Sequence, residues 1–380
     1  MSGTFACIAG GGTAGHLLPG IAVADALVER GHRPDSIHFV GGARGPEVTI
    51  VADAGFPLTV LPGRGIPRKL SLASLKAAVG VARGVLSGIG LIRRLHPQVV
   101  IVLGGYAAVP CVVGAIIWRV PMVIMEQNAL AGAANRLAGP FAKVAAVPFA
   151  ETDLRRAVVT GNPVRPEILA VSRPDDTAGA RQRLDLPADR TVIAVFSGSL
   201  GSARINQAVG GLAARWRERS DLAIHHVVGA RDWDAESAAS ADSAGPAPAV
   251  GPWPVGLVYH RVRYEDRMPD LLAAADVAVC RAGGSTVAEL AQVGLGAVLV
   301  PLPIATRDHQ RANAEVLVRA GAAVRVPDAE LDTDRLADEL ERLLAGKGTL
   351  ADMAAAAHTL AHPDAAVRVA ALAEEHARHG

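Results

Sequence analysis

Aromatic residues and net charge are both scarce in this chain. Aromatic side chains make up 3% of its 380 residues, whereas hydrophobic residues make up 50%. We therefore expect cores of Ala, Val, Leu and Ile, the usual filling of buried parallel strands and their covering helices. The net charge of +1 gives no overall field that would favour nucleic acid or a strongly acidic partner. The length suits two domains of ordinary size better than one.

Cysteines and long apolar runs are scarce as well. Cys7, Cys111 and Cys280 lie within apolar segments and lack the spacing of metal ligands, so we expect buried, reduced thiols in a cytosolic protein. The apolar stretch from Ala107 to Ile117 is shorter than the roughly 20 residues that a bilayer span needs. The N-terminus enters a strand without a charged region before it, so we expect no signal peptide.

Glycine, by contrast, is concentrated in three turns that each follow an apolar strand and open a helix. They are Gly10–Gly15, Ser197–Ser202 and Arg281–Thr286. A turn of this kind presents backbone N–H groups beside the positive end of a helix, which makes it a receptor for phosphate. Because the turns are divided between the two halves of the chain, they indicate a protein that holds phosphorylated ligands from both sides of a cleft.

Short apolar strands alternate with helices in both halves, which predicts doubly wound parallel sheets. We expect a helix at Pro19–Arg30 and one or two helices at Leu70–Leu95. The turn-rich segment Thr160–Pro166 is the expected hinge, which gives domains at 1–161 and 162–350 and a helical tail at 351–380. Strands are expected at Phe5–Ala9, Ile37–Val40, Val99–Leu103, Met122–Met125, Val144–Val147, Val192–Phe196, Ile224–Val228, Leu257–Tyr259, Val277–Cys280, Ala297–Pro301 and Ala323–Val326.

The first glycine turn also satisfies the dinucleotide fingerprint G-x-G-x-x-G. That fingerprint needs an acidic residue at the end of the second strand, and the segment Phe39–Arg44 has none, so a dehydrogenase is disfavoured. His16 follows the turn at the start of the expected helix, where the positive helix end disfavours the protonated imidazole and keeps the ring available as a base. The alternative is a histidine that only hydrogen-bonds the loop.

Further polar residues follow other strands at the carboxyl edge, where sheets of this class bind ligands. Glu126-Gln127-Asn128 can cap the next helix or contact a sugar, and Tyr106 follows two glycines that allow close approach. Glu289 lies one turn into a helix, where it either complements the helix dipole or accepts ribose hydroxyls. The polar run Arg307–Asn313 adds amides at the same edge.

Taken together, these motifs resemble the lipid-linked N-acetylglucosaminyltransferases of peptidoglycan synthesis. The matching segments occur in the family's order and span Gly11 to about Gly321. They are Gly11–His16 with Pro19, Gly104–Tyr106, Glu126–Asn128, Gly161–Arg165, Gly198-Ser199 with Gly201, Ala203-Arg204 and Asn206, Arg281–Glu289, and His309-Gln310 with Asn313. No single segment is specific, but their combination is.

The resemblance implies a GT-B fold, in which two Rossmann-like domains face a cleft. The first domain would bind the acceptor and the second the UDP-sugar. The implied reaction moves GlcNAc from UDP-GlcNAc to the muramyl sugar of lipid I (undecaprenyl-diphosphate-MurNAc-pentapeptide), giving lipid II with inversion at the anomeric carbon. The enzyme would act peripherally at the cytoplasmic face of the bacterial cell membrane, without a cofactor.

The resemblance also implies roles for individual residues. His16 is the best-placed general base, and no Asp-x-Asp motif for a metal occurs in a plausible loop. Acceptor-side candidates are Gly12, Tyr106, Glu126 and Asn135. Donor contacts are implied at Thr13, Ala14, Gly15, Asn128, Arg165, Ser199, Gly284, Ser285, Thr286, Val287, Ala288, Glu289 and Gln310.

Three positions depart from the family pattern. Met125 stands where histidine is common, Leu200 replaces a common glutamine beside the expected nucleotide site, and Ala14 replaces a common glycine. A GT-B transferase with another lipid or natural-product acceptor is therefore the nearest alternative. A UDP-GlcNAc 2-epimerase is a second alternative, but its carboxylate-rich catalytic set is not evident in this sequence. A non-catalytic sugar-nucleotide binding module is disfavoured by the presence of His16 and of both half-sites.

A lipid-linked acceptor would require contact with the bilayer surface. The segment from Arg68 to Leu95 carries Lys69, Lys76, Arg83, Arg93 and Arg94 among Leu, Val and Ile residues. Such a mixture suits a helical face on anionic lipid. It suits a helix packed on the sheet with solvated charges equally well.

Overall fold

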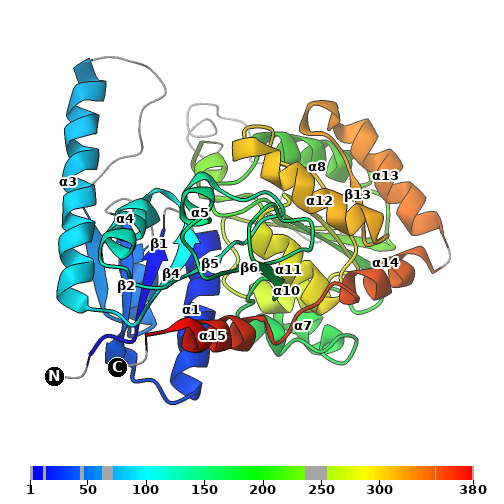
Figure 1. Ribbon diagram of the computed structural model, residues 1–380. Coiled ribbons are helices and arrows are strands. Elements are labelled where there is room, and N and C mark those ends of the chain that lie inside the picture. The colour runs from blue at the N-terminus through cyan, green and yellow to red at the C-terminus, as the bar shows by residue number, and fades with distance from the viewer. Residues whose placement is uncertain are drawn as a thin grey trace. The chain divides into compact units, whose positions relative to one another are not determined.

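The computed structural model describes residues 3–11, 14–42, 47–61, 72–235, 255–346 and 348–378, with the backbone alone at 14, 47 and 72–81. The chain divides into two compact units (Figure 1). Unit 1 comprises Met1–Arg165 together with His362–Gly380, and unit 2 comprises Pro166–Ala361. The residues after 350 therefore do not form the separate tail that the sequence suggested, because their helices pack into the cores of the two units.

Unit 1 contains a seven-stranded sheet in which all neighbours run parallel, in the order β3-β2-β1-β4-β5-β6-β7. The strands are β1 (Ala6–Gly10), β2 (Ile37–Gly42), β3 (Leu58–Leu61), β4 (Val99–Gly104), β5 (Met122–Met125), β6 (Val144–Val147) and β7 (Ala157–Val159). Five of them confirm the expected strands. The sequence missed β3 and β7, the two edge strands, because short, half-exposed edges carry little apolar signal.

Helices cover both faces of this sheet. Ala6 and Ile8 of β1 join a core with residues of α1 and α15, whereas Cys7 and Ala9 join a second core with residues of α3, α4 and α5, as the two-residue repeat of a strand requires. Helix α15, near the end of the chain, packs directly on α1 (Figure 1). The helices are α1 (Ala14–Glu29), α2 (Glu47–Asp53), α3 (Leu72–Leu95), α4 (Val109–Ile117), α5 (Ala133–Ala138) and α15 (Ala365–His376), with short 3-10 helices η1 (Pro34–Ser36) and η2 (Tyr106–Ala108).

Helix α3 is a single helix of 24 residues, although glycines recur along its sequence. The packing of α3 against α4 explains the glycine at position 88. A Cβ built on Gly88 would lie 2.6 Å from the carbonyl carbon of Pro110 in α4, so the absence of a side chain lets the two helices approach closely. No described helix is both long enough and apolar enough to cross a bilayer.

Unit 2 contains a six-stranded parallel sheet in the order β10-β9-β8-β11-β12-β13. The strands are β8 (Thr191–Phe196), β9 (Leu222–Val227), β10 (Val258–Val262), β11 (Val277–Cys280), β12 (Ala297–Leu299) and β13 (Ala323–Arg325). All six confirm the expected strands to within a few residues, and the order is that of the dinucleotide-binding doubly wound fold.

The core of unit 2 is aliphatic, as the composition predicted. Alternate residues of β8, Ile193 and Val195, pack with buried residues of α8 and α13 and with Met353 of α14. The helices are α6 (Pro166–Leu169), α7 (Thr177–Arg183), α8 (Ala203–Arg215), α10 (Met268–Ala274), α11 (Gly284–Val293), α12 (His309–Arg319), α13 (Thr333–Ala345) and α14 (Thr349–His358), with η3 (Thr306–Asp308) and η4 (Asp328–Glu330). All three cysteines are free and buried, as expected.

Candidate active site

The glycine turns lie at the point in each sheet where the strand order reverses. In unit 1 the strand order proceeds from β1 towards one edge of the sheet and from β4 towards the other edge. In unit 2 the same holds for β8 and β11. At such a switch point the following helices separate to opposite faces and leave a crevice at the carboxyl ends of the strands, where sheets of this class bind ligands. The structure therefore gives each unit its own candidate site.

In unit 1 the turns that follow β1 and β4 touch through their backbones. Gly105 has φ of +77°, and a Cβ built on it would lie 2.5 Å from the carbonyl oxygen of Gly11. A residue with a side chain would strain the backbone and separate the two turns. Half-buried Tyr106 follows directly and opens η2, which brings this acceptor-side candidate to the switch point.

His16 lies within the first turn of α1, not before it. The helix begins at Ala14 and carries Pro19 in its interior, so the expectation of a start at Pro19 is wrong. The expected preference of proline for the first helical turn did not hold here. The imidazole is half-buried at the positive helix end. Gly12, Thr13 and the side chain of Ala14 lie outside the described residues.

Glu126 organises the loop that follows β5. It is only 2% exposed. Its Oε1 accepts hydrogen bonds from the N–H groups of Gln127 and Asn128, both at 3.0 Å, and from Asn128 Nδ2 at 3.1 Å. Its Oε2 accepts from the N–H of Gly132 at 2.9 Å and from Asn135 Nδ2 at 2.8 Å. The carboxylate thus holds the loop together from within.

The structure shows how this triplet supports its loop. Glu126 and Asn135, which is 1% exposed, hold the loop from the interior, and the contact of these two residues with the acceptor stays a prediction. Asn135 also lies against Gly104, at 3.2 Å from the position of a Cβ there. The half-buried Asn128 remains the member of the set with access to solvent. Arg165, also half-buried, ends the first segment of unit 1.

In unit 2 the Ser197–Ser202 turn leads from β8 into α8. Ser199 and Leu200 are exposed at its tip. Ser202 forms the N-cap of α8, where its side chain accepts a hydrogen bond from the N–H of Ile205 at 3.4 Å. The family resemblance includes this segment, but the sequence did not predict the cap.

Arg281 ties this turn to the neighbouring loops. Its guanidinium donates to Ser202 Oγ at 2.6 Å and to the carbonyl oxygen of Val300 at 3.0 Å, and it pairs with Asp328 at 2.6 Å. The side chain is 12% exposed, so these contacts are largely shielded from water and hold their geometry. The sequence placed Arg281 in a glycine turn, but only the fold shows this clamp.

Helix α11 presents its first turn at the same edge. Its N-cap is Gly283, whose lack of a side chain leaves the cap without a side-chain hydrogen bond. Gly284, Ser285, Thr286 and Ala288 are half-buried, whereas Val287 is 1% exposed. The Val287 side chain lies in the core, and its N–H donates to the carbonyl oxygen of Gly283 at 3.0 Å, so its packing stabilises the start of the helix.

Glu289 lies one turn further and is half-buried. Burial raises the pKa of the Cys280 thiol, and the charge of Glu289 raises it further. The Glu289 carboxylate therefore lies close to the end of β11, at the switch point. Gln310 joins two loops at this edge, because its Oε1 accepts from the N–H groups of Ala282 at 3.3 Å and Leu302 at 2.9 Å.

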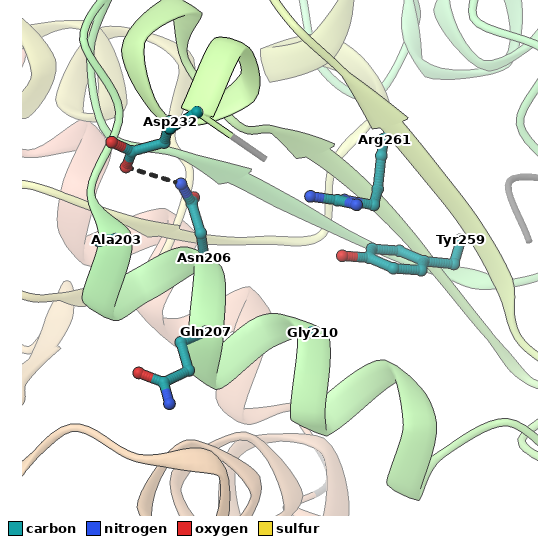
Figure 2. Close-up of a pocket in the computed structure, with 8 residues that line it drawn as sticks. Ala203, Asn206, Gln207, Gly210, Asp232, Tyr259 and Arg261 are labelled. Atoms are coloured by element: carbon teal, nitrogen blue, oxygen red, sulfur yellow. Dashed lines mark hydrogen bonds between the residues drawn. The ribbon is translucent and has the colours of Figure 1, made fainter. Parts of the chain in front are cut away.

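A cavity of about 470 Å³ lies beside α8 at the β10 side of unit 2 (Figure 2). None of the described residues that were expected to contact the donor lines it. Its lining residues are Ala203, Asn206, Gln207, Gly210, Asp232, Ala235, Tyr259 and Arg261. Across the described ranges, no three His, Cys, Asp or Glu side chains converge in an arrangement that could hold a metal ion.

Comparison with known proteins gives matches over nearly the whole chain. Residues 6–147 match the N-terminal domain of glycosyltransferase family 28, and residues 192–369 match its C-terminal domain. The crystal structure of Acinetobacter baumannii MurG superposes with a TM-score of 0.74 at 28% sequence identity, covering 98% of this chain and 99% of that one. The fold is therefore GT-B.

Two curated relatives carry the same name, UDP-N-acetylglucosamine–N-acetylmuramyl-(pentapeptide) pyrophosphoryl-undecaprenol N-acetylglucosamine transferase. The protein of Desulforudis audaxviator is 36% identical over 98% of both chains. That of Mycobacterium sp. (strain KMS) is 39% identical over 100% of this chain and 97% of its own length. With similarity of this extent, the chain belongs to this family of N-acetylglucosaminyltransferases.

Proposed function

We propose that this enzyme transfers GlcNAc from UDP-GlcNAc to a hydroxyl of the muramyl sugar of lipid I. The observation that carries the proposal is the placement of the glycine turns, because both sheets have them at their switch points. The names of the relatives, together with their full-length similarity, supply the substrates. Unit 2 holds UDP, and the turns of unit 1 meet the acceptor.

His16 acts as the general base in this proposal. Its imidazole accepts the proton of the attacking hydroxyl while the hydroxyl oxygen bonds to the anomeric carbon and the bond to the β-phosphate oxygen breaks. The positive end of α1 favours the neutral ring that such a base requires. A positioned base contributes roughly 100-fold or more to the rate.

The leaving diphosphate gains negative charge as the bond breaks. In this proposal the charge is received by the N–H groups at the start of α11, whose N-cap Gly283 supplies no side chain, and by the turn with the exposed Ser199. Preorganised donors and a helix N-terminus stabilise such charge in the transition state. Glu289 accepts the ribose hydroxyls of the same nucleotide.

The test is an assay with radiolabelled UDP-GlcNAc and lipid I. Labelled lipid II is the expected product, and the variant His16→Ala should form it about 100-fold more slowly while binding UDP as the wild type does. Label transferred only to another acceptor, or UDP-GlcNAc converted to its 2-epimer, would replace the proposal by an alternative. Unchanged turnover of the variant would remove His16 from the mechanism.

We further propose that the enzyme reaches the bilayer surface peripherally through α3 and the end of α4. Leu86 is 68% exposed and Ile117 51% exposed. Trp118 donates from Nε1 to the carbonyl oxygen of Ile89 at 3.0 Å, and the Arg93 guanidinium lies 5.2 Å from its ring. Exposed apolar side chains beside a tryptophan and arginines suit the interface of an anionic membrane.

Sedimentation with vesicles that contain phosphatidylglycerol tests this surface. The double variant Arg83→Glu/Arg93→Glu should stay in the supernatant, because both charges face the lipid headgroups in the proposal. Arg33→Glu/Arg217→Glu, the same charge change at exposed arginines outside α3 and α4, should sediment like the wild type. Equal sedimentation of the two double variants would exclude this face as the membrane contact. Of the lysines named from sequence, Lys69 lies outside the described residues, and so does the side chain of Lys76.

A further inference from the structure

A chain of buried polar side chains lies directly behind the Ser197–Ser202 turn. The hydroxyl of Tyr259 lies 2.9 Å from His226 Nδ1, and His226 Nε2 lies 2.9 Å from Asn206 Oδ1. Asn206 Nδ2 in turn lies 3.1 Å from the carbonyl oxygen of Val228 and 3.0 Å from Asp232 Oδ2. His226 is fully buried and Asn206 is 7% exposed, so the bond between them is shielded from water, whereas Tyr259 and Asp232 at the two ends are half-buried beside the cavity.

The partners determine the direction of every hydrogen bond in this chain. A carbonyl oxygen and a carboxylate only accept, so the amide NH₂ of Asn206 must face Val228 and Asp232. Its oxygen then faces His226, which fixes the proton of His226 on Nε2 and leaves Nδ1 to accept from the hydroxyl of Tyr259. Burial lowers the pKa of His226 to about 3, with the charges of Arg261 and His225 acting in the same direction, so the ring is neutral as this chain requires.

The atoms that Asn206 binds are the atoms on which the turn rests. Gly201 has φ of +84°, and a Cβ built on it would lie 2.3 Å from the carbonyl oxygen of Val228 and 3.0 Å from Asp232 Oδ2. The N–H of Ala230 donates to the carbonyl oxygen of Ser199 at 3.0 Å. Asn206, one turn into α8, therefore links the helix to the surface that supports Ser199 and Gly201.

We propose that Asn206 is a positioning residue for the donor diphosphate, and that neutral His226 and Tyr259 fix the orientation of its amide. The inference rests on the proposed function, since it needs UDP to bind at the Ser197–Ser202 turn. Asn206 does not touch the ligand. It holds Val228 and Asp232 in the geometry that aims the turn and the start of α8 at the phosphates.

The experiment measures UDP binding by calorimetry and the Michaelis constants of both substrates. Asn206→Ala should raise the dissociation constant of UDP and the KM for UDP-GlcNAc together by about tenfold, the effect of losing hydrogen bonds worth about 1.4 kcal/mol. The KM for lipid I should stay within about twofold. A loss of folded enzyme alone would lower the apparent kcat and leave both Michaelis constants unchanged, which would refute positioning.

Two further variants keep the test decisive. Asn206→Asp keeps the shape of the side chain and the acceptor for His226 but loses both N–H donors. It should therefore weaken UDP binding as much as Asn206→Ala does. Tyr259→Phe removes only the hydroxyl at the far end of the hydrogen-bond chain. It should weaken UDP binding by about threefold, the effect of losing one neutral hydrogen bond. If Asn206→Ala does not fold, unchanged UDP binding by Tyr259→Phe overturns the proposal.

Gln207 supplies the matched control. It is the next residue of α8 and lines the same cavity, but it is exposed and projects away from Asn206 and Asp232 (Figure 2). Gln207→Ala should bind UDP like the wild type, and a loss equal to that of Asn206→Ala would overturn the proposal. Wild-type enzyme that fails to bind UDP would refute the proposed function itself, and this inference with it.

Discussion

Acidification should destabilise unit 2 through His226. The folded state holds this ring neutral, since burial lowers its pKa to about 3, whereas an unfolded histidine takes up a proton near pH 6.5. Above the unfolded pKa of about 6.5 both states hold the ring neutral, and the free energy of unfolding does not depend on this group. As the pH drops from about 6.5 towards about 3, only the unfolded state binds the proton, so the free energy of unfolding falls.

The size of the effect follows from that window. A drop from pH 7.5 to pH 5.5 extends about one pH unit below the unfolded pKa of about 6.5, and only that part of the range contributes. His226 alone should therefore remove about 1.4 kcal/mol from the free energy of unfolding. Burial also lowers the pKa of His38, His225, His260 and His362, so the whole protein loses more than this. Only the difference between wild type and a His226 variant isolates the contribution.

The assay is urea unfolding followed by tryptophan fluorescence at the two pH values. Trp216, which packs in the core of unit 2, reports on the unit that contains His226. His226→Gln retains one donor and one acceptor but does not titrate, so its stability should fall by about 1.4 kcal/mol less than that of the wild type. His96→Gln, at an exposed histidine of unit 1, should follow the wild type. Equal pH dependence of the wild type and His226→Gln would refute the buried, neutral histidine.

Two other expectations concern carboxylates of the two sites. Glu289→Ala should weaken UDP binding by on the order of 1.5–3 kcal/mol, as loss of a charge-assisted hydrogen bond to the ribose does, and equal dissociation constants by calorimetry would contradict that role. Glu126→Gln places an NH₂ group against N–H donors inside the loop after β5, so it should lower the free energy of unfolding of unit 1 by about 3 kcal/mol. A thermal denaturation curve that coincides with that of the wild type would show that the buried charge is not needed.

Most strands and all three glycine turns could be predicted from the sequence. Runs such as Val99–Leu103 and Met122–Met125 are continuous and aliphatic, which is typical of a strand buried on both faces. The turns are local as well, since glycine readily adopts the backbone conformations that a sharp passage from strand to helix requires. The family resemblance followed from these local signals in their order.

The tertiary structure alone decided which distant segments meet. The return of α15 onto α1 and the clamp of Arg281 on Ser202 and Asp328 join residues far apart in the chain, and no local periodicity encodes such a contact. The same holds for His226, which belongs to none of the sequence motifs. Its role depends on Asn206 of α8 and Tyr259 of β10, and these surround it only when β9 lies between β8 and β10. Hydrogen bonds in a buried network depend on angstrom-scale placement, which strand order and packing determine and the chain's local pattern does not.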